Sequence, residues 1–310
     1  MKHNTKVTIT LIAMFLITQL IGLAVIQFYN NPDQNLPFGM EPPQEMTSEE
    51  QGIQTLYKNI IPAFIFAIFL FFILTKIKAE KFIRAWFFLV TVIALGITFN
   101  AIFLKSNLIT YASYSALAVA MILAYFKIYK RNLTIHNITE LLIYPGIATI
   151  FVSILNVLGI IILLLLISLY DIWAVWHSQF MQKMANYQIN NIKIFTGFFI
   201  PYADKKTKLK IEKLKQKYKD KKQLEKKFKT SKIKVNLAIL GGGDVIFPII
   251  TAGVFLKTYP TIFPALTITI SSTLALSYLL LSAKKGKFYP AMPFITIGMY
   301  IGMIFSWLVF

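Results

Sequence analysis

Two aspartates in this chain could do chemistry, because each lies deep within an apolar run. Asp171 follows Tyr170, and Asp244 follows three consecutive glycines, Gly241 to Gly243. A carboxylate at the centre of a bilayer costs about 2.5–3.5 kcal/mol even on lenient insertion scales, so such a residue indicates a functional site. Two carboxyls that face each other share one proton. The charged member can then accept a proton from a water molecule, while the neutral member donates its proton.

The segments that carry these aspartates are predicted to span a membrane. With 56% hydrophobic residues, the 310-residue chain is too apolar for a soluble domain, and we expect an all-α polytopic membrane protein. One apolar run, 138–176, would measure roughly 58 Å as a single helix against a bilayer core of about 30 Å, so we expect two helices with a turn near 156–159. The remaining apolar runs are 7–28, 58–74, 82–104, 108–126, 235–256, 260–282 and 288–310. The sequence therefore predicts nine transmembrane helices.

The first of these runs, at about 22 residues, exceeds the core of a signal peptide and is expected to remain as a helix. The distribution of positive charge then predicts the orientation. With the N-terminus in the cytoplasm, all Lys and Arg residues lie on the cytoplasmic side except Lys58, Lys105 and Lys257. The chain is thus predicted to be integral to the cell membrane, with a cytoplasmic N-terminus and an extracellular C-terminus.

We divide the chain into three parts that together form one membrane domain. Residues 1–176 form an N-terminal six-helix portion, residues 177–234 a Lys-rich cytoplasmic loop, and residues 235–310 a C-terminal three-helix portion. The loop contains 17 Lys against 4 acidic residues. We expect it to contact the anionic headgroups of the lipid bilayer. No nucleic-acid partner is expected, since aromatic residues do not alternate with the basic ones.

This topology places both aspartates near the cytoplasmic ends of consecutive antiparallel helices. By helical rise, Asp171 lies roughly 8 Å and Asp244 roughly 14 Å from that edge. The three glycines weaken the helix beside Asp244, and Pro248 has no N–H to bond the Asp244 carbonyl, so irregular backbone lining a cavity is expected there. Close helix packing is the alternative explanation of the glycines. The ninth helix starts at the same end, with Pro290-Ala291-Met292-Pro293.

Three motifs resemble those of the presenilin and signal peptide peptidase family of intramembrane aspartyl proteases. Tyr170-Asp171 is similar to the family's Tyr-Asp motif, Gly241-x-Gly243-Asp244 to Gly-x-Gly-Asp, and Pro290-Ala291-Met292 to Pro-Ala-Leu, with Met in place of Leu. The resemblance implies a presenilin-like fold in a prokaryotic or archaeal homologue. It also implies an aspartic endopeptidase of the GxGD type, with Asp171 and Asp244 as the catalytic pair. Its substrates would be transmembrane helices or signal-peptide remnants.

Substrate helices must be unwound before cleavage, and two segments with period-two alternation could bind them. Segments 191–195 and 232–237 are expected to form strands that pair with the substrate, although the second could instead be the first turn of the seventh helix. The candidate substrate-positioning residues are Tyr170, Gly241, Gly242, Gly243, Pro290, Ala291, Met292, Ile233 and Val235.

Other chemistry and other sites receive less support. With no Cys and only three His, none at ligand spacing from another, neither a metal site nor a cofactor is expected. Glu140, near the predicted start of the fifth helix, is expected to be a first-turn acid favoured by the helix dipole. The glycosylation sequons at Asn132 and Asn137 are interpreted as chance matches, because the topology makes them cytoplasmic.

A cation-coupled membrane transporter is the main alternative function, since transporters also keep aspartates beside glycine-broken helices. It predicts an inverted copy of the broken segment in the first half of the chain, and none is seen. The physiological substrate and homo-oligomerisation stay open.

Overall fold

A computed structural model describes residues 5–31, 34–40, 54–77, 79–106, 111–130, 132–177, 196–202, 207, 236–283 and 289–310. Within these ranges the chain forms nine long helical segments, which match the nine predicted spans in order, and one short 3-10 helix, η1 (Pro37–Gly39). The elements of the nine segments are α1 (Thr5–Tyr29), η2 (Leu56–Ile60) with α3 (Ile61–Lys76), α4 (Glu80–Ser106), α5 (Ala112–Tyr125) with η3 (Phe126–Lys130), α6 (Leu133–Ile154), α7 (Val157–Ile172) with η4 (Trp173–His177), α11 (Gly242–Thr258), α12 (Phe263–Ser282) and α13 (Met292–Val309). Eight segments are long and apolar enough to cross a membrane. The exception is α11, with 17 residues.

The apolar run 138–176 is divided into two helices, as its length predicts. Helix α6 ends at Ile154 and α7 begins at Val157. Between them Asn156 has an extended backbone, and its Oδ1 accepts a hydrogen bond from the Gly159 N–H at 2.8 Å, which is the usual N-cap arrangement. A Cβ on Gly159 would lie 2.8 Å from that same oxygen, so glycine is the residue that fits the cap.

The predicted seventh helix, 235–256, is wrong at its N-terminal end. Strand β2 (Asn236–Gly241) occupies that place and pairs antiparallel with β1 (Gly197–Tyr202), so that Gly197 lies opposite Gly241. Exposed Leu237 and Ile239 alternate in β2 with buried neighbours, which is the period of a strand. The strand hypothesis for 232–237 is therefore confirmed at its last two residues. Its earlier residues, Ile233 and Val235 included, and the predicted strand 191–195 lie outside the described residues.

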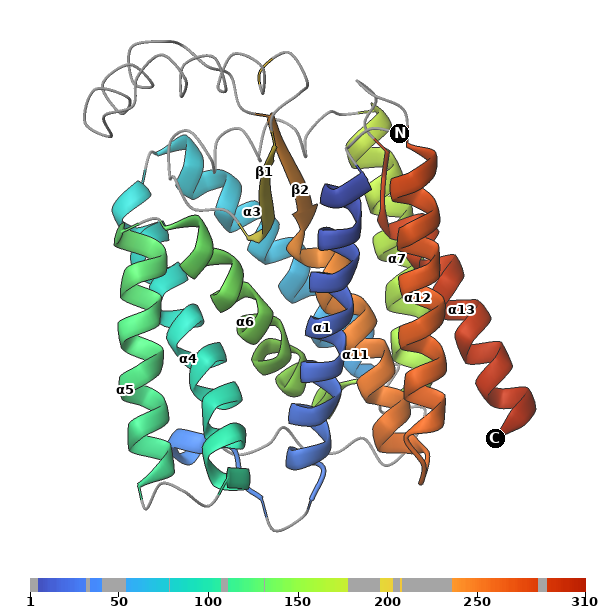
Figure 1. The fold of residues 1–310 in the computed structure, drawn as a ribbon, viewed down its shortest axis with the longest axis horizontal. Coiled ribbons are helices and arrows are strands. Elements are labelled where there is room, and N and C mark those ends of the chain that lie inside the picture. The colour runs from blue at the N-terminus through green and yellow to red at the C-terminus, as the bar shows by residue number, and fades with distance from the viewer. Residues whose placement is uncertain are drawn as a thin grey trace.

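Helix α11 is the centre of the main core. Its residues are buried over most of its length, and α1, α6, α7, α12 and α13 all contact it. A helix that is apolar on all sides is expected to be enclosed by others. Figure 1 shows α11 behind α1, between α6 and α12. Helices α4 and α5 pack on the other side of α6 around a smaller cluster.

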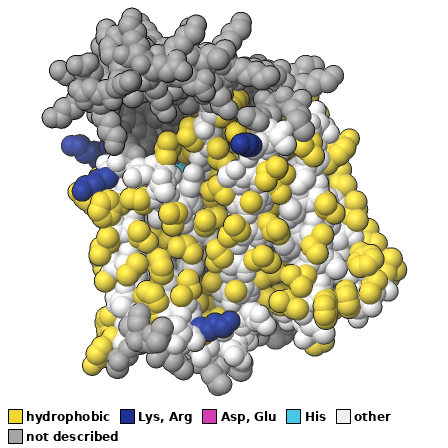
Figure 2. All heavy atoms as spheres, in the orientation of Figure 1, with side chains coloured by type: hydrophobic (Ala, Val, Ile, Leu, Met, Phe, Trp, Pro, Cys, Tyr) yellow, Lys and Arg dark blue, Asp and Glu magenta, His cyan; other side chains and the backbone are white. Residues whose placement is uncertain are grey.

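The β1–β2 sheet lies at one end of the helix bundle. Figure 1 shows the start of α1 and the end of α7 at this same end, whereas α13 ends towards the opposite one. On the face visible in Figure 2, apolar side chains cover the middle, and the basic side chains in view lie above and below it. This distribution fits a protein whose middle is surrounded by lipid.

Candidate active site

Asp171 lies in the last turn of α7 and is held by the start of α13. Its side chain is buried, and its Oδ2 accepts a hydrogen bond from the Met292 N–H at 3.1 Å. The carboxylate also interacts with the backbone of Ala291. The first N–H groups of a helix have no partner within the helix, and the helix dipole favours negative charge beside them. Asp171 therefore caps α13 from outside that helix.

Two further hydrogen bonds fix α7 against α13. Ser168 Oγ donates to Thr296 Oγ1 at 2.7 Å, about one turn from Asp171 on one helix and from Met292 on the other. Farther along, the Tyr300 hydroxyl donates to the Ile161 carbonyl at 2.7 Å. Hydrogen bonds of this kind join helices where apolar surfaces offer no preference for one register. They set the position of the Asp171 carboxylate relative to the start of α13.

Asp244 lies in the first turn of α11, not in the third turn of a longer helix as the sequence suggested. Gly241 is the N-cap residue, so Asp244 occupies the third helical position. Its carboxylate interacts with the backbone N–H of Gly241, and a Cβ on Gly241 would lie 3.1 Å from Asp244 Oδ2. An acidic side chain that reaches back to the N-cap in this way is one half of a capping box.

The two carboxylates lie near each other, Asp171 where α7 ends and Asp244 where α11 begins. Helix α7 packs against α11, and Asp171 and Asp244 are close enough to interact electrostatically. Each is also beside the start of a helix, α13 for Asp171 and α11 for Asp244. Both acids thus lie at the same end of two antiparallel helices that contact each other. This arrangement can hold one proton between two carboxyls and present both to the same reacting bond.

Gly242 and Gly243, which precede Asp244, have different surroundings. Gly242 is buried against α6, and a Cβ there would lie 2.7 Å from the Tyr144 hydroxyl oxygen, so close packing explains this residue. Gly243 is exposed, and the nearest atom to an added Cβ would be Phe247 Cε2 at 3.8 Å. Packing therefore does not require glycine at 243.

The other predicted residues have simpler surroundings. Tyr170 is half-buried, and its ring lies 6.4 Å from that of Trp173. Pro290 is buried and precedes α13, while Ala291 is the N-cap residue.

Gln19 is a residue that sequence reasoning missed. It is fully buried in α1, and its Nε2 donates to the Val245 carbonyl at 2.9 Å. That carbonyl is next to the Asp244 carbonyl, whose usual helical donor is absent because residue 248 is a proline.

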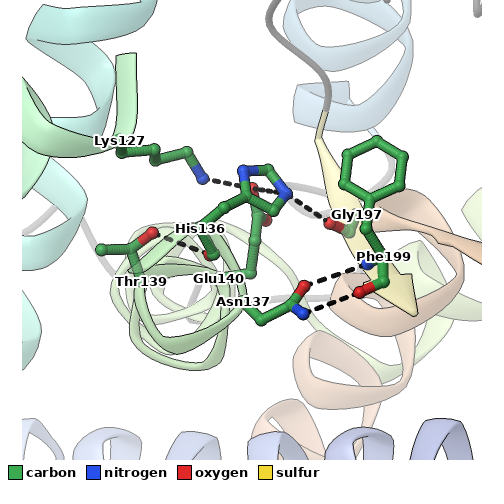
Figure 3. Close-up of polar contacts among 7 residues, drawn as sticks. All are labelled: Lys127, His136, Asn137, Thr139, Glu140, Gly197 and Phe199. Atoms are coloured by element: carbon green, nitrogen blue, oxygen red, sulfur yellow. Dashed lines mark hydrogen bonds and ion pairs between the residues drawn. The ribbon is translucent and has the colours of Figure 1, made fainter. Parts of the chain in front are cut away.

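A second buried polar cluster, on α6, was also missed (Figure 3). Glu140 is fully buried in the third turn of α6 and forms an ion pair with Lys127, so the first-turn interpretation is wrong. The error arose because α6 begins at Leu133, before the apolar run. His136 Nε2 lies 2.8 Å from the Gly197 carbonyl oxygen, and Asn137 bonds the backbone of Phe199. The i, i+4 spacing of His136 and Glu140 was the available signal.

Known proteins resemble the whole chain. The family model described as signal-peptide peptidase, presenilin aspartyl protease matches residues 12–310. Two solved structures of a presenilin family intramembrane aspartate protease, in space groups C222 and P2, are each 17% identical to the chain, with TM-scores of 0.62 and 0.58. The first alignment covers 98% of this chain and 99% of the other, and the second covers 97% of both. No curated protein matches. The structural likeness establishes the fold, and the family match includes both aspartates.

Proposed function

Because the chain belongs to the signal-peptide peptidase and presenilin family of aspartyl proteases, we propose that Asp171 and Asp244 are the catalytic pair with which it hydrolyses peptide bonds. The protein is an integral membrane aspartic endopeptidase that acts within the membrane on transmembrane substrates. The observation that supports the proposed pair is the electrostatic interaction between Asp171, at the end of α7, and Asp244, at the start of α11, together with the bond from the start of α13 to Asp171. No other acidic pair in the described ranges combines these features.

In the proposed mechanism the pair shares one proton. The charged carboxylate accepts a proton from a bound water as that water attacks the scissile carbonyl carbon, and the neutral carboxyl donates its proton to the carbonyl oxygen. Collapse of the intermediate breaks the C–N bond and returns a proton to the leaving nitrogen. The N–H of Met292 keeps the Asp171 carboxylate in place throughout. The two aspartates act as one coupled unit, so acid and base roles belong to the pair.

Strand β2 is the proposed binding site for unwound substrate. In an antiparallel pair, successive residues direct their backbone groups alternately towards and away from the partner strand. The Gly242 N–H bonds Thr196 in the direction of β1, so the backbone groups of Gly241, Ile239 and Leu237 face away from it. An extended substrate can add to this edge by β-augmentation. The edge ends at Gly241, which is next to the Asp244 carboxylate.

Two apolar side chains support the same placement of substrate. Leu237 is 39% exposed and Ile239 is 40% exposed, although both are large and lie on the strand that leads to the site. An apolar segment taken from a transmembrane helix could cover them. Ile233 and Val235 stay proposed contacts farther along the same segment.

The proposed orientation places this site towards the cytoplasm. The sheet lies at the end of the bundle where α1 starts (Figure 1). With the N-terminus cytoplasmic, His177 and strand β1 lie at the cytoplasmic end. Most of the Lys-rich loop 177–234 lies outside the described residues, and its contact with anionic lipid headgroups stays a proposal.

The test is cleavage of a single-span helical peptide by purified protein in liposomes. Asp171→Asn and Asp244→Asn are each expected to abolish cleavage while the circular dichroism spectrum stays helical, because an amide cannot accept the water's proton. A hydroxyethylene transition-state analogue is expected to block the wild type. Glu80→Gln removes a carboxylate at the start of α4, away from the site, and is the matched control that keeps activity. Turnover by either aspartate variant would exclude the proposed pair.

A further inference from the structure

The outer edge of β1, on the side away from β2, is occupied by two side chains of α6. The residues whose backbone groups face this side are Gly197, Phe199 and Pro201, by the same alternation. His136 Nε2 lies 2.8 Å from the Gly197 carbonyl oxygen. Asn137 Oδ1 accepts from the Phe199 N–H at 3.0 Å, and Asn137 Nδ2 donates to the Phe199 carbonyl at 2.7 Å (Figure 3). Pro201 has no N–H to offer.

The Asn137 side chain takes the place of a third strand. An amide group carries one acceptor oxygen and two donor hydrogens in one plane. The Asn137 amide can therefore bond both the N–H and the carbonyl of Phe199, as the backbone of a residue in a neighbouring strand would. The backbone of β1 is thereby fixed to α6 at one defined residue, whatever side chain stands at position 199.

The face of α6 that holds β1 also contacts the start of α11. His136, Glu140 and Tyr144 follow each other at intervals of four residues and so share one face of the helix. Glu140 is paired with Lys127, and both side chains are almost fully buried. The Tyr144 hydroxyl lies against Gly242 and interacts electrostatically with Glu140 and with Asp244. One rigid helix face therefore touches both the beginning of β1 and the turn that carries Asp244.

We propose that Asn137 and His136 are positioning residues of the protease, which fix β1 on α6 and so set which substrate peptide bond reaches Asp244. This inference rests on the proposed function, in which substrate adds to the free edge of β2. Because β1 and β2 are paired in one register, the location of β1 determines the location of that edge. A slip of one residue along a strand moves a peptide bond by about 3.3 Å, which removes it from reach of the catalytic pair.

The test measures where and how fast the full-length protein cleaves a single-span helical peptide in liposomes. Asn137→Leu removes both bonds to Phe199. It is expected to lower kcat by about tenfold or more, with KM changed by less than about threefold, because binding to β2 persists while positioning is lost. Mass spectrometry of the products should show cleavage at additional bonds displaced from the wild-type position. A purely structural role would reduce the yield of active protein without moving the cleaved bond.

Two variants accompany this measurement. Asn137→Asp keeps an acceptor for the Phe199 N–H but has no donor for the carbonyl, so a smaller fall in kcat with some displaced cleavage is expected. If Asn137→Leu does not fold, the cleavage rate and cleavage position of Asn137→Asp test the positioning role in its place. Thr149→Val is the matched control, because Thr149 is buried in the same helix and its hydroxyl donates to the Pro145 carbonyl of α6. It should cleave the wild-type bond at the wild-type rate.

The outcomes separate this inference from the proposed function. Cleavage by Asp244→Asn under the same conditions would remove the proposed function itself. If Asp244→Asn is inactive but the folded Asn137 variants cleave only the wild-type bond at the wild-type rate, the catalytic pair stands and the positioning role is overturned.

Discussion

Gly242 and Gly243 are adjacent, yet the structure gives alanine substitutions at the two positions opposite effects on stability. A Cβ at Gly242 would lie 2.7 Å from the Tyr144 hydroxyl oxygen and 3.1 Å from its Cε1. The Tyr144 ring is buried and packs edge-on against Phe198, so it has little room to move. Overpacking a core by one methyl group costs about 1–3 kcal/mol. A Cβ at Gly243 would meet its nearest atom at 3.8 Å. Within a helix, alanine there is favoured over glycine by about 0.5–1 kcal/mol.

The assay is thermal unfolding of purified protein in detergent, followed by tryptophan fluorescence. Gly242→Ala should lower the unfolding midpoint, and Gly243→Ala should leave it unchanged or raise it. Tyr144→Phe removes the nearest atom from the overlap, so the double variant with Gly242→Ala should be more stable than the two single changes predict. In this double-mutant cycle of Gly242→Ala and Tyr144→Phe, we expect a coupling free energy of about 1 kcal/mol. Equal destabilisation by the two alanines, or a cycle with no coupling, would refute the packing explanation of Gly242.

Two further predictions concern the strand and the buried ion pair. Ile239→Pro removes a backbone N–H that faces away from β1. The rate at which the helical peptide is cleaved should fall by about tenfold or more, while the midpoint of thermal unfolding changes little. An undiminished cleavage rate would rule out the β2 edge as the substrate site. Glu140→Gln leaves the buried Lys127 charge without its partner and should lower the free energy of unfolding by about 3–5 kcal/mol. Adding Lys127→Met removes that charge, so the double variant should regain most of the lost stability. Thermal unfolding of the single and double variants measures this, and a double variant no more stable than Glu140→Gln would contradict it.

The order of the helices could be predicted because it depends only on lengths of apolar sequence. A run of 39 residues from 138 to 176 cannot cross a bilayer once, and Asn156 supplies the cap that divides it. The meeting of Asp171 with the start of α13 followed in the same way. Successive transmembrane helices run in opposite directions. The end of the sixth helix, which carries Asp171, and the start of the ninth, which carries Met292, therefore lie on the same side of the membrane.

The start of α11 and the cluster on α6 could not be predicted from apolar length. Residues 236–241 are apolar enough to continue a helix. The alternation in 232–237 predicted a strand only as far as residue 237, and pairing with β1, far away in the sequence, extends it to Gly241. Glu140 is buried because its ion-pair partner, Lys127, lies on another helix. Burial of an acid is acceptable when a cation accompanies it, and that companion is a tertiary contact that no local pattern reveals.

The contact between Asp171 and Met292 also explains why the Pro-Ala-Leu resemblance tolerates methionine. What reaches the Asp171 carboxylate is the N–H of residue 292, assisted by the backbone of Ala291. Pro290 and Pro293 flank these two residues, and each proline fixes its own φ and contributes no N–H. The donors that remain between them are thus held in place at the helix start. The side chain at 292 is buried and contributes volume, in which Met and Leu differ little. The segment therefore contacts Asp171 through its backbone, and in the proposed mechanism this contact holds the Asp171 carboxylate near Asp244 of α11.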